Sequence, residues 1–124
     1  MDTVMCLSRY SLGAMLVVFG LNGFYTFIPV PPMAAPAQQF MSALMETGYL
    51  LYLWKAIEVV SGMLLLVNRY VCLALLMFLP VAVNIFCFHL FLDPNSIVVG
   101  TLVLGLTVLL LSQHLSTLQQ ILKK

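Results

Sequence analysis

Two residues of opposite charge lie three positions apart inside a long apolar segment. In a helix, Lys55 and Glu58 would share one face, with Gly62 a further turn along it. An ionisable group in a bilayer costs at least about 2.5 kcal/mol on insertion scales, so it needs a partner or a function. The spacing predicts an ion pair. A membrane-embedded carboxyl can also relay protons, which makes the pair a candidate functional site, with a purely structural role as the alternative.

Other polar side chains fall at similar depth in neighbouring apolar segments. At 1.5 Å per residue, Lys55 and Glu58 lie about 9 and 14 Å from the outer boundary, and Asn22 and Asn84 about 20 and 22 Å from the inner one. His89 ends the third segment. Together these residues predict a polar pocket in the outer half of a helix bundle. The alternative for the two asparagines is interhelical hydrogen bonding without a ligand.

Cysteine and histidine add little further chemistry. Cys87 follows Asn84 by three residues on the same helix face and is, with Gly62, an additional candidate for the pocket, although a small buried thiol is the simpler interpretation. The cysteines form no Cys-x-x-Cys pair, and neither His89 nor His114 has the companions of a metal site. No dithiol centre and no metal are expected.

The composition indicates where these side chains must lie. Of 124 residues, 63% are hydrophobic and 7% are charged, whereas charged residues supply about a quarter of a soluble protein. So few charges cannot cover a globule in water. The composition also excludes disordered and collagen-like chains and leaves no basic face for nucleic acid. An integral membrane protein, with the lipid bilayer as its partner, is therefore predicted.

Four apolar segments are long enough to cross a bilayer, at about 10–28, 49–67, 70–92 and 96–115. Prolines after Ile28, the Asn68-Arg69 link and the Asp93-Pro94-Asn95-Ser96 turn separate them. Links this short make neighbouring helices antiparallel. We expect one all-α domain over residues 1–124, an antiparallel four-transmembrane-helix bundle. A signal peptide is the alternative for the first segment, but that segment exceeds the roughly 7 to 15 residues of a signal-peptide core.

Two amphipathic stretches extend beyond these spans. Residues 36–47 alternate at helical spacing between an apolar and a polar face, which predicts a short interfacial helix that roofs the outer end of the bundle. After Leu111 an apolar stripe continues through Leu115, Leu118 and Leu122. It predicts that the fourth helix continues to a length of about 40 Å. Residues 116–124 would then form a cytoplasmic tail.

The placement of basic residues predicts the orientation. Arg9, Arg69, Lys123 and Lys124 fall on one side, whereas the loops of the other side contain Glu46 and Asp93 without Lys or Arg. Because basic residues concentrate in cytoplasmic loops, both ends of the chain are predicted to be cytoplasmic, in a multi-pass protein of the plasma (inner) membrane.

Several short segments resemble the DoxX family of small four-helix membrane proteins. These are Phe19-Gly20-Leu21-Asn22-Gly23-Phe24, Phe27-Ile28-Pro29, the stretch from Phe40 to Gly48-Tyr49, Lys55 with Glu58 and Gly62, and Pro80 followed by Asn84-Ile85 and Phe88-His89. The resemblance runs from about Arg9 into the fourth span. The family is named after a membrane subunit of a thiosulfate-to-quinone oxidoreductase, so the resemblance implies a four-helix bundle associated with membrane redox chemistry. The absent cysteine pair separates the chain from disulfide-generating proteins of the vitamin K epoxide reductase type.

Three functions follow as hypotheses. The first is a redox-associated protein that binds a quinone or another small amphiphile in the outer pocket, with Glu58 relaying protons and Lys55 or His89 contacting an oxygen of the ligand. The second is a non-catalytic scaffold or assembly factor that docks another membrane or redox protein, or a second copy. Its contacts would be the face of Thr101 and Gly105 and the stripe of Leu115, Leu118 and Leu122. The third is a small oligomeric transporter, disfavoured because no inverted repeat is visible.

Overall fold

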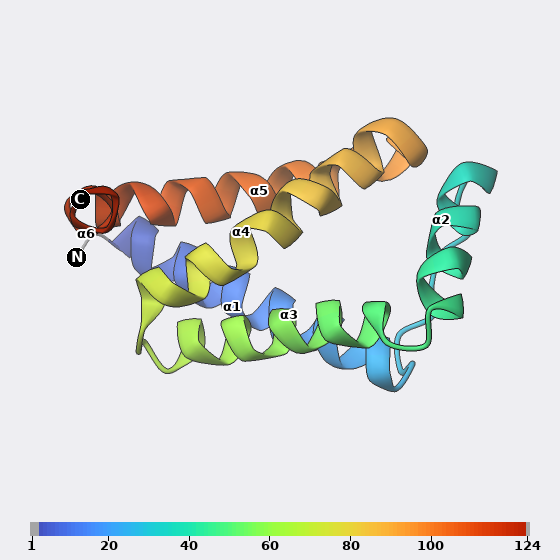
Figure 1. Ribbon diagram of the computed structural model, residues 1–124, viewed down its shortest axis with the longest axis horizontal. Coiled ribbons are helices and arrows are strands. Elements are labelled where there is room, and N and C mark those ends of the chain that lie inside the picture. The colour runs from blue at the N-terminus through green and yellow to red at the C-terminus, as the bar shows by residue number, and fades with distance from the viewer. Residues whose placement is uncertain (1–2, 124) are drawn as a thin grey trace.

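The computed structural model describes residues 3–123, and the regular structure within this range is entirely helical (Figure 1). The helices are α1 (Thr3–Phe24), α2 (Ala35–Glu46), α3 (Leu50–Leu66), α4 (Val71–Cys87), η1 (Phe88–Leu92), η2 (Pro94–Ser96), α5 (Ile97–Leu111), η3 (Ser112–His114) and α6 (Leu115–Leu122). The predicted all-α class is confirmed.

Three stretches of the described chain are long and apolar enough to cross a membrane, namely Thr3–Phe24, Val71–Leu92 and Pro94–Leu122. A fourth is added if α2 and α3, which meet at 95°, are counted as one broken span. The helices therefore support a multi-pass membrane protein with three or four spans.

Helices α1 and α3 run antiparallel and approach most closely where both carry glycine. Gly13 lies opposite Gly62, and Gly23 opposite Lys55, so residue numbers rise along one helix as they fall along the other. A Cβ atom at Gly62 would lie only 2.8 Å from the carbonyl oxygen of Gly13. Because real Cβ atoms do not come that close to a backbone oxygen, this backbone contact requires glycine.

A buried apolar cluster joins α1, α3, α4 and α5. Its members with little or no exposed surface are Leu12, Leu16, Leu65, Ala74, Leu75, Phe78, Val81, Ala82, Val103, Leu110 and Leu111. They recur at helical spacing, as expected for the inward stripe of each helix.

The corner between α2 and α3 is built by Thr47 and Gly48. The Thr47 hydroxyl donates to the carbonyl of Leu44, 2.7 Å away, and accepts from the amide of Leu50 at 3.0 Å, so it caps the end of α2 and the start of α3. Gly48 has φ +80°, a left-handed conformation that glycine adopts without strain. Figure 1 shows the result: α2 stands across one end of the molecule, which we call the α2 end.

The α3–α4 link lies at the opposite end, together with α6, and we call it the α6 end (Figure 1). Asn68 and Tyr70 flank Arg69 there in left-handed conformations, with φ of 56° and 52°. The amide of Arg69 donates to the carbonyl of Leu64 at 3.1 Å, closing the end of α3. The predicted short link at Asn68-Arg69 is present.

The fourth long helix is not one straight rod of about 40 Å as the apolar stripe predicts. The backbone tightens at η3 and leaves helical geometry at His114, with φ −117° and ψ 23°. Helix α6 then points away from the axis of α5 and is seen nearly end-on in Figure 1. The stripe continues in register, but the break redirects its last part.

Candidate functional site

The predicted ion pair is present on α3. The Lys55 ammonium nitrogen lies 3.4 Å from both carboxylate oxygens of Glu58. The two side chains are buried unequally, since 22% of the lysine side chain is exposed and only 5% of the glutamate. The glutamate side chain is thus inside the bundle, whereas the lysine side chain is partly exposed.

Glycines of α1 create the space for this pair. A Cβ atom at Gly23 would lie 2.4 Å from Cγ of Lys55, so the lysine stem crosses α1 where that helix has no side chain. One turn earlier, a Cβ atom at Gly20 would lie 2.6 Å from Cγ2 of Val59 and 3.2 Å from Cβ of Glu58. Gly62, a candidate for the pocket, instead packs against Gly13 and Leu16 of α1.

Asn22 does not reach the ion pair or a neighbouring helix through any of its hydrogen bonds. Its carbonyl oxygen accepts from the amides of Phe27 and Ile28, at 2.9 and 2.8 Å, and its amide group donates to the Ile28 carbonyl at 3.3 Å. The side chain therefore fixes the segment that follows α1. The expected pocket contact, and its interhelical alternative, are both replaced by this local turn.

Asn84 lies on the outer surface of α4, which corrects its predicted inward position. The residue is exposed, whereas Ala82 and Val81 are buried. Two residues correspond to about 200° around a helix, so Asn84 faces away from Ala82. Depth along the helix was predicted from residue counting, but counting alone did not indicate the direction around its axis. Cys87, the additional candidate, is half-buried and carries a free thiol.

An aromatic cluster closes the α2 end of the bundle. Phe40 of α2 lies 6.5 Å from the Trp54 ring of α3, edge to face, and 5.6 Å from the Phe88 ring of η1. The Phe88 ring in turn meets the His89 imidazole at 5.2 Å. We call these four residues the α2-end aromatic cluster. Through Phe40, α2 covers the end of the bundle and bridges α3 to η1.

His89 brings an unpaired polar atom to this cluster. Its Nδ1 is buried and has no partner of hydrogen-bond geometry among residues 3–123, and Asp93 is the charged residue that interacts with the ring. The imidazole packs on Gly100 of α5. A Cβ atom added at Gly100 would lie 3.0 Å from Cδ2 of His89. His89 sits in η1, a π-helical turn that continues α4, and such turns recur at functional sites. A buried polar atom without a partner is a position where a ligand or water can bond.

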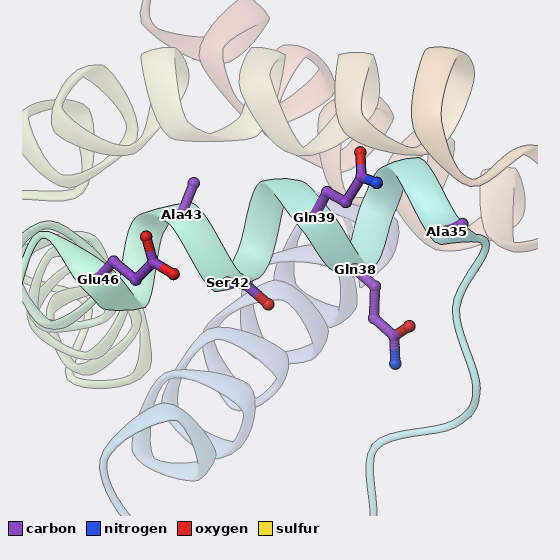
Figure 2. A pocket seen from close by; sticks show the side chains of 6 residues that line it. All are labelled: Ala35, Gln38, Gln39, Ser42, Ala43 and Glu46. Atoms are coloured by element: carbon purple, nitrogen blue, oxygen red, sulfur yellow. The ribbon is translucent and has the colours of Figure 1, made fainter.

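Two hollows on the surface lie elsewhere. Figure 2 shows the first, whose six lining residues all belong to α2: Ala35, Gln38, Gln39, Ser42, Ala43 and Glu46. Gln38 and Ser42 point to one side of this helix and Gln39 and Ala43 to the other, so no second element encloses the space (Figure 2). The second hollow is small and lies under the α2–α3 corner, lined by residues from Leu44 to Tyr52. Neither hollow includes Lys55 or Glu58.

Arg9 is a buried charge that sequence reasoning treated only as a topology signal. It is 4% exposed, and its guanidinium donates to the carbonyl oxygen of Leu65 at the end of α3. Within the part of the chain that the structure describes, its Nε has no hydrogen-bond partner. Its carbon Cζ lies 4.3 Å from the centre of the Tyr10 ring. A cation at a helix C-terminus meets the free carbonyls and the negative end of the helix dipole, so Arg9 ties the start of α1 to the end of α3.

Within residues 3–123, no group of three or more His, Cys, Asp or Glu side chains is placed to hold a metal ion. Comparison with protein-family models, characterised proteins and solved structures finds no match to this chain. The resemblance to the DoxX family therefore stays a prediction from the quoted segments.

Proposed function

We propose that this chain is a four-span membrane protein that binds a quinone or a similar small amphiphile at the α2 end of its bundle. The observation that carries the proposal is the buried Nδ1 of His89, which is unpaired among the described residues and belongs to the α2-end aromatic cluster. The same cluster contains Trp54, which precedes Lys55 in the sequence. Hydrogen-bond donors and a positive charge suit the carbonyl oxygens of a quinone, and aromatic side chains suit its flat ring.

In this proposal α3 crosses the membrane in addition to the three long apolar stretches, and α2 lies in the outer membrane surface. The 17 residues of α3 reach about 26 Å, close to the roughly 30 Å of a bilayer core, and α3 packs along α1, which is itself long and apolar enough to cross. The 95° bend turns α2 away from the span. The exposed basic residues Arg69 and Lys123 lie at the α6 end, so that end is assigned to the cytoplasm.

In the proposal, each polar residue at the α2 end has its own role in binding the quinone or in proton transfer. A bound quinone supplies the redox chemistry, taking up electrons and protons. The Lys55 ammonium, on a partly exposed side chain, donates to a ligand oxygen, and the Nδ1–H of His89 donates to another. Glu58, paired with Lys55 inside the bundle, holds or releases a proton next to that ammonium.

The single tryptophan of the chain allows a direct test. Trp54 contacts Phe40 of the cluster, so a bound quinone is expected to quench its fluorescence. We expect saturable quenching of the purified protein in lipid nanodiscs by a short-chain ubiquinone analogue. The variants His89→Ala and Lys55→Ala should each weaken binding about tenfold, the effect of one hydrogen bond of about 1.4 kcal/mol.

The matched control is His114→Ala, which removes the other histidine, in η3 at the α6 end. It should leave the affinity unchanged. Quenching that never saturates, or an equal loss in His114→Ala and His89→Ala, would contradict the proposal.

A second candidate function is docking of another transmembrane helix on α5. A Cβ atom at Gly105 would meet nothing within 4 Å, unlike one at Gly20 or Gly62, and Thr101 is exposed one turn earlier. Such small residues let a partner helix come close. Recovery of a membrane partner in mild detergent that is lost in Gly105→Leu, but kept in Val99→Leu on another face of α5, would favour this function.

A further inference from the structure

Helix α6 is amphipathic along its whole length. At about 100° per residue, Leu115, Leu118, Ile121 and Leu122 fall within about a third of its circumference. Serine, threonine and glutamine occupy the rest, at positions 116, 117, 119 and 120. Such a division between faces is typical of a helix that lies in an interface between water and an apolar phase.

Most of the apolar face of α6 has no cover from the rest of the protein. Leu118 packs against the buried cluster and anchors the helix at one point. Leu122 is 82% exposed, Ile121 61% and Leu115 58%. The break at His114 sets this face at an angle to α5, so it does not continue along the bundle surface.

Among residues 3–123, the exposed charges at the α6 end are positive. Lys123 is exposed directly after the helix, Lys124 follows in the sequence outside the described residues, and Arg69 is exposed in the α3–α4 link at the same end. The acidic residues of the described chain lie elsewhere: Glu46 and Asp93 border the α2 end and Glu58 is inside the bundle. An anionic surface complements this combination of apolar and basic side chains.

We infer that α6 lies in the inner membrane surface as an in-plane anchor, with its apolar face among acyl chains and the adjoining Lys123 on anionic phospholipid head groups. Three exposed apolar side chains cannot supply the roughly 800 Å² that each partner of a stable protein interface buries, so lipid is a better occupant than a second copy. The inference rests on the proposed membrane placement and is independent of quinone binding.

The test measures lipid bound to the intact protein. Native mass spectrometry in mild detergent follows titration with phosphatidylglycerol and, separately, phosphatidylcholine. We expect the parent to bind the anionic lipid more tightly, and Lys123→Gln with Lys124→Gln to weaken that binding about fivefold per lysine. Ile121→Ser with Leu122→Ser should weaken the binding of both lipids. Gln119→Ser with Gln120→Ser changes the same number of residues on the polar face and should change neither.

Each outcome shows whether lipid, a second copy or another protein covers the apolar face of α6. Equal affinity of the parent for the two lipids, or unchanged affinity in the lysine variant, overturns the inference. A dimer that is lost in Ile121→Ser with Leu122→Ser overturns it in favour of a second copy, and a co-purified protein lost in that variant overturns it in favour of a protein partner. The α6 variants should still quench with quinone as the parent does, so failure of this inference and failure of the proposed function are distinguishable.

Discussion

At the scale of single residues, burial of Glu58 depends on Lys55. The carboxylate is 5% exposed and its hydrogen bonds in the structure come from the lysine alone, among the described residues. A buried charge that loses its partner is strongly destabilising, whereas replacing both partners by neutral groups of similar size often is not. The pair can therefore be tested as a unit.

We predict that Lys55→Met destabilises the protein by about 3 kcal/mol and that the double variant Lys55→Met with Glu58→Gln recovers most of this loss. The measurement is unfolding in mixed micelles followed by circular dichroism. A double variant as unstable as the single one would mean that Glu58 has a further essential partner.

The glycines of α1 give a second residue-scale prediction. A Cβ atom at Gly20 would lie 3.1 Å from the backbone nitrogen of Val59 as well as 2.6 Å from its side chain, so α1 and α3 must move apart to accept it. We predict that Gly20→Ala costs about 2 kcal/mol of stability in the same unfolding measurement.

The chain supplies a matched control for this change. Gly105→Ala adds the same methyl group to a helix where nothing lies within 4 Å, and alanine is a better helix former than glycine. It should leave stability unchanged or raise it. Equal losses in the two variants would show that the glycine contact between α1 and α3 is not a tight one.

The residue-scale predictions from sequence succeeded where spacing alone decides the geometry. Lys55 and Glu58 are neighbours on one helix, so their pairing follows from the helical repeat. The surroundings of Asn84 on α4 and His89 on η1 depend on the direction that each side chain faces around its helix, which spacing alone does not give. Asn22 could bond either to a neighbouring helix or to the turn that follows it, and the sequence does not decide between the two. Burial of Arg9 depends on the free carbonyl of Leu65, which lies 56 residues away in sequence and is not a local signal.

At the scale of elements, apolar length predicted most boundaries within one or two residues. A helix is present at Ala35–Glu46, where an interfacial helix is predicted over 36–47, and the segment predicted at 49–67 contains α3, Leu50–Leu66. The first helix is displaced, since it begins at Thr3 and ends at Phe24, while the apolar run spans 10–28. Polar residues such as Ser8 and Arg9 continue that helix because the bundle buries them. The local composition could not indicate this.

The corner between α2 and α3 is the element whose conformation matters most for the proposed site, because it positions Phe40 over Trp54. We predict that Gly48→Ala destabilises the corner by about 1 kcal/mol, since an L-residue at φ +80° is strained even though the space around it is open. The measurements are the emission maximum of Trp54 and the thermal unfolding of the protein followed by Trp54 fluorescence.

Gly48→Asn is the control for strain at this position, because asparagine tolerates left-handed conformations better than alanine does. It should fall between the parent and Gly48→Ala. If both variants match the parent, the corner adopts a different backbone conformation in the membrane.

At the scale of the whole molecule, the charged residues separate along its long axis. Among residues 3–123, exposed basic residues gather at the α6 end, the acidic residues Glu46 and Asp93 border the α2 end, and an amphipathic helix lies at each end. The proposed orientation follows from this pattern: the basic end would face the cytoplasm, and the ion pair would lie nearer the opposite surface.

The orientation can be measured by cysteine accessibility in intact cells. Ser42→Cys places a thiol on the exposed polar face of α2, and Gln120→Cys places one on the exposed polar face of α6. A membrane-impermeant maleimide added from outside should label the first variant in whole cells and the second only after permeabilisation. The parent chain, with its half-buried Cys6, Cys72 and Cys87, gives the background.

The reverse labelling pattern would mean that the protein has the opposite orientation in the membrane, and this would change both proposals. The proposed quinone site would then open toward the cytoplasm, and α6 would meet the outer leaflet. Labelling of both variants from outside would instead mean that the chain crosses the membrane an even number of times between the two positions. Since α4 and α5 form one hairpin, that result would leave α3 lying in the membrane without crossing it. The number of spans and the side of the site are therefore decided by the same two cysteines.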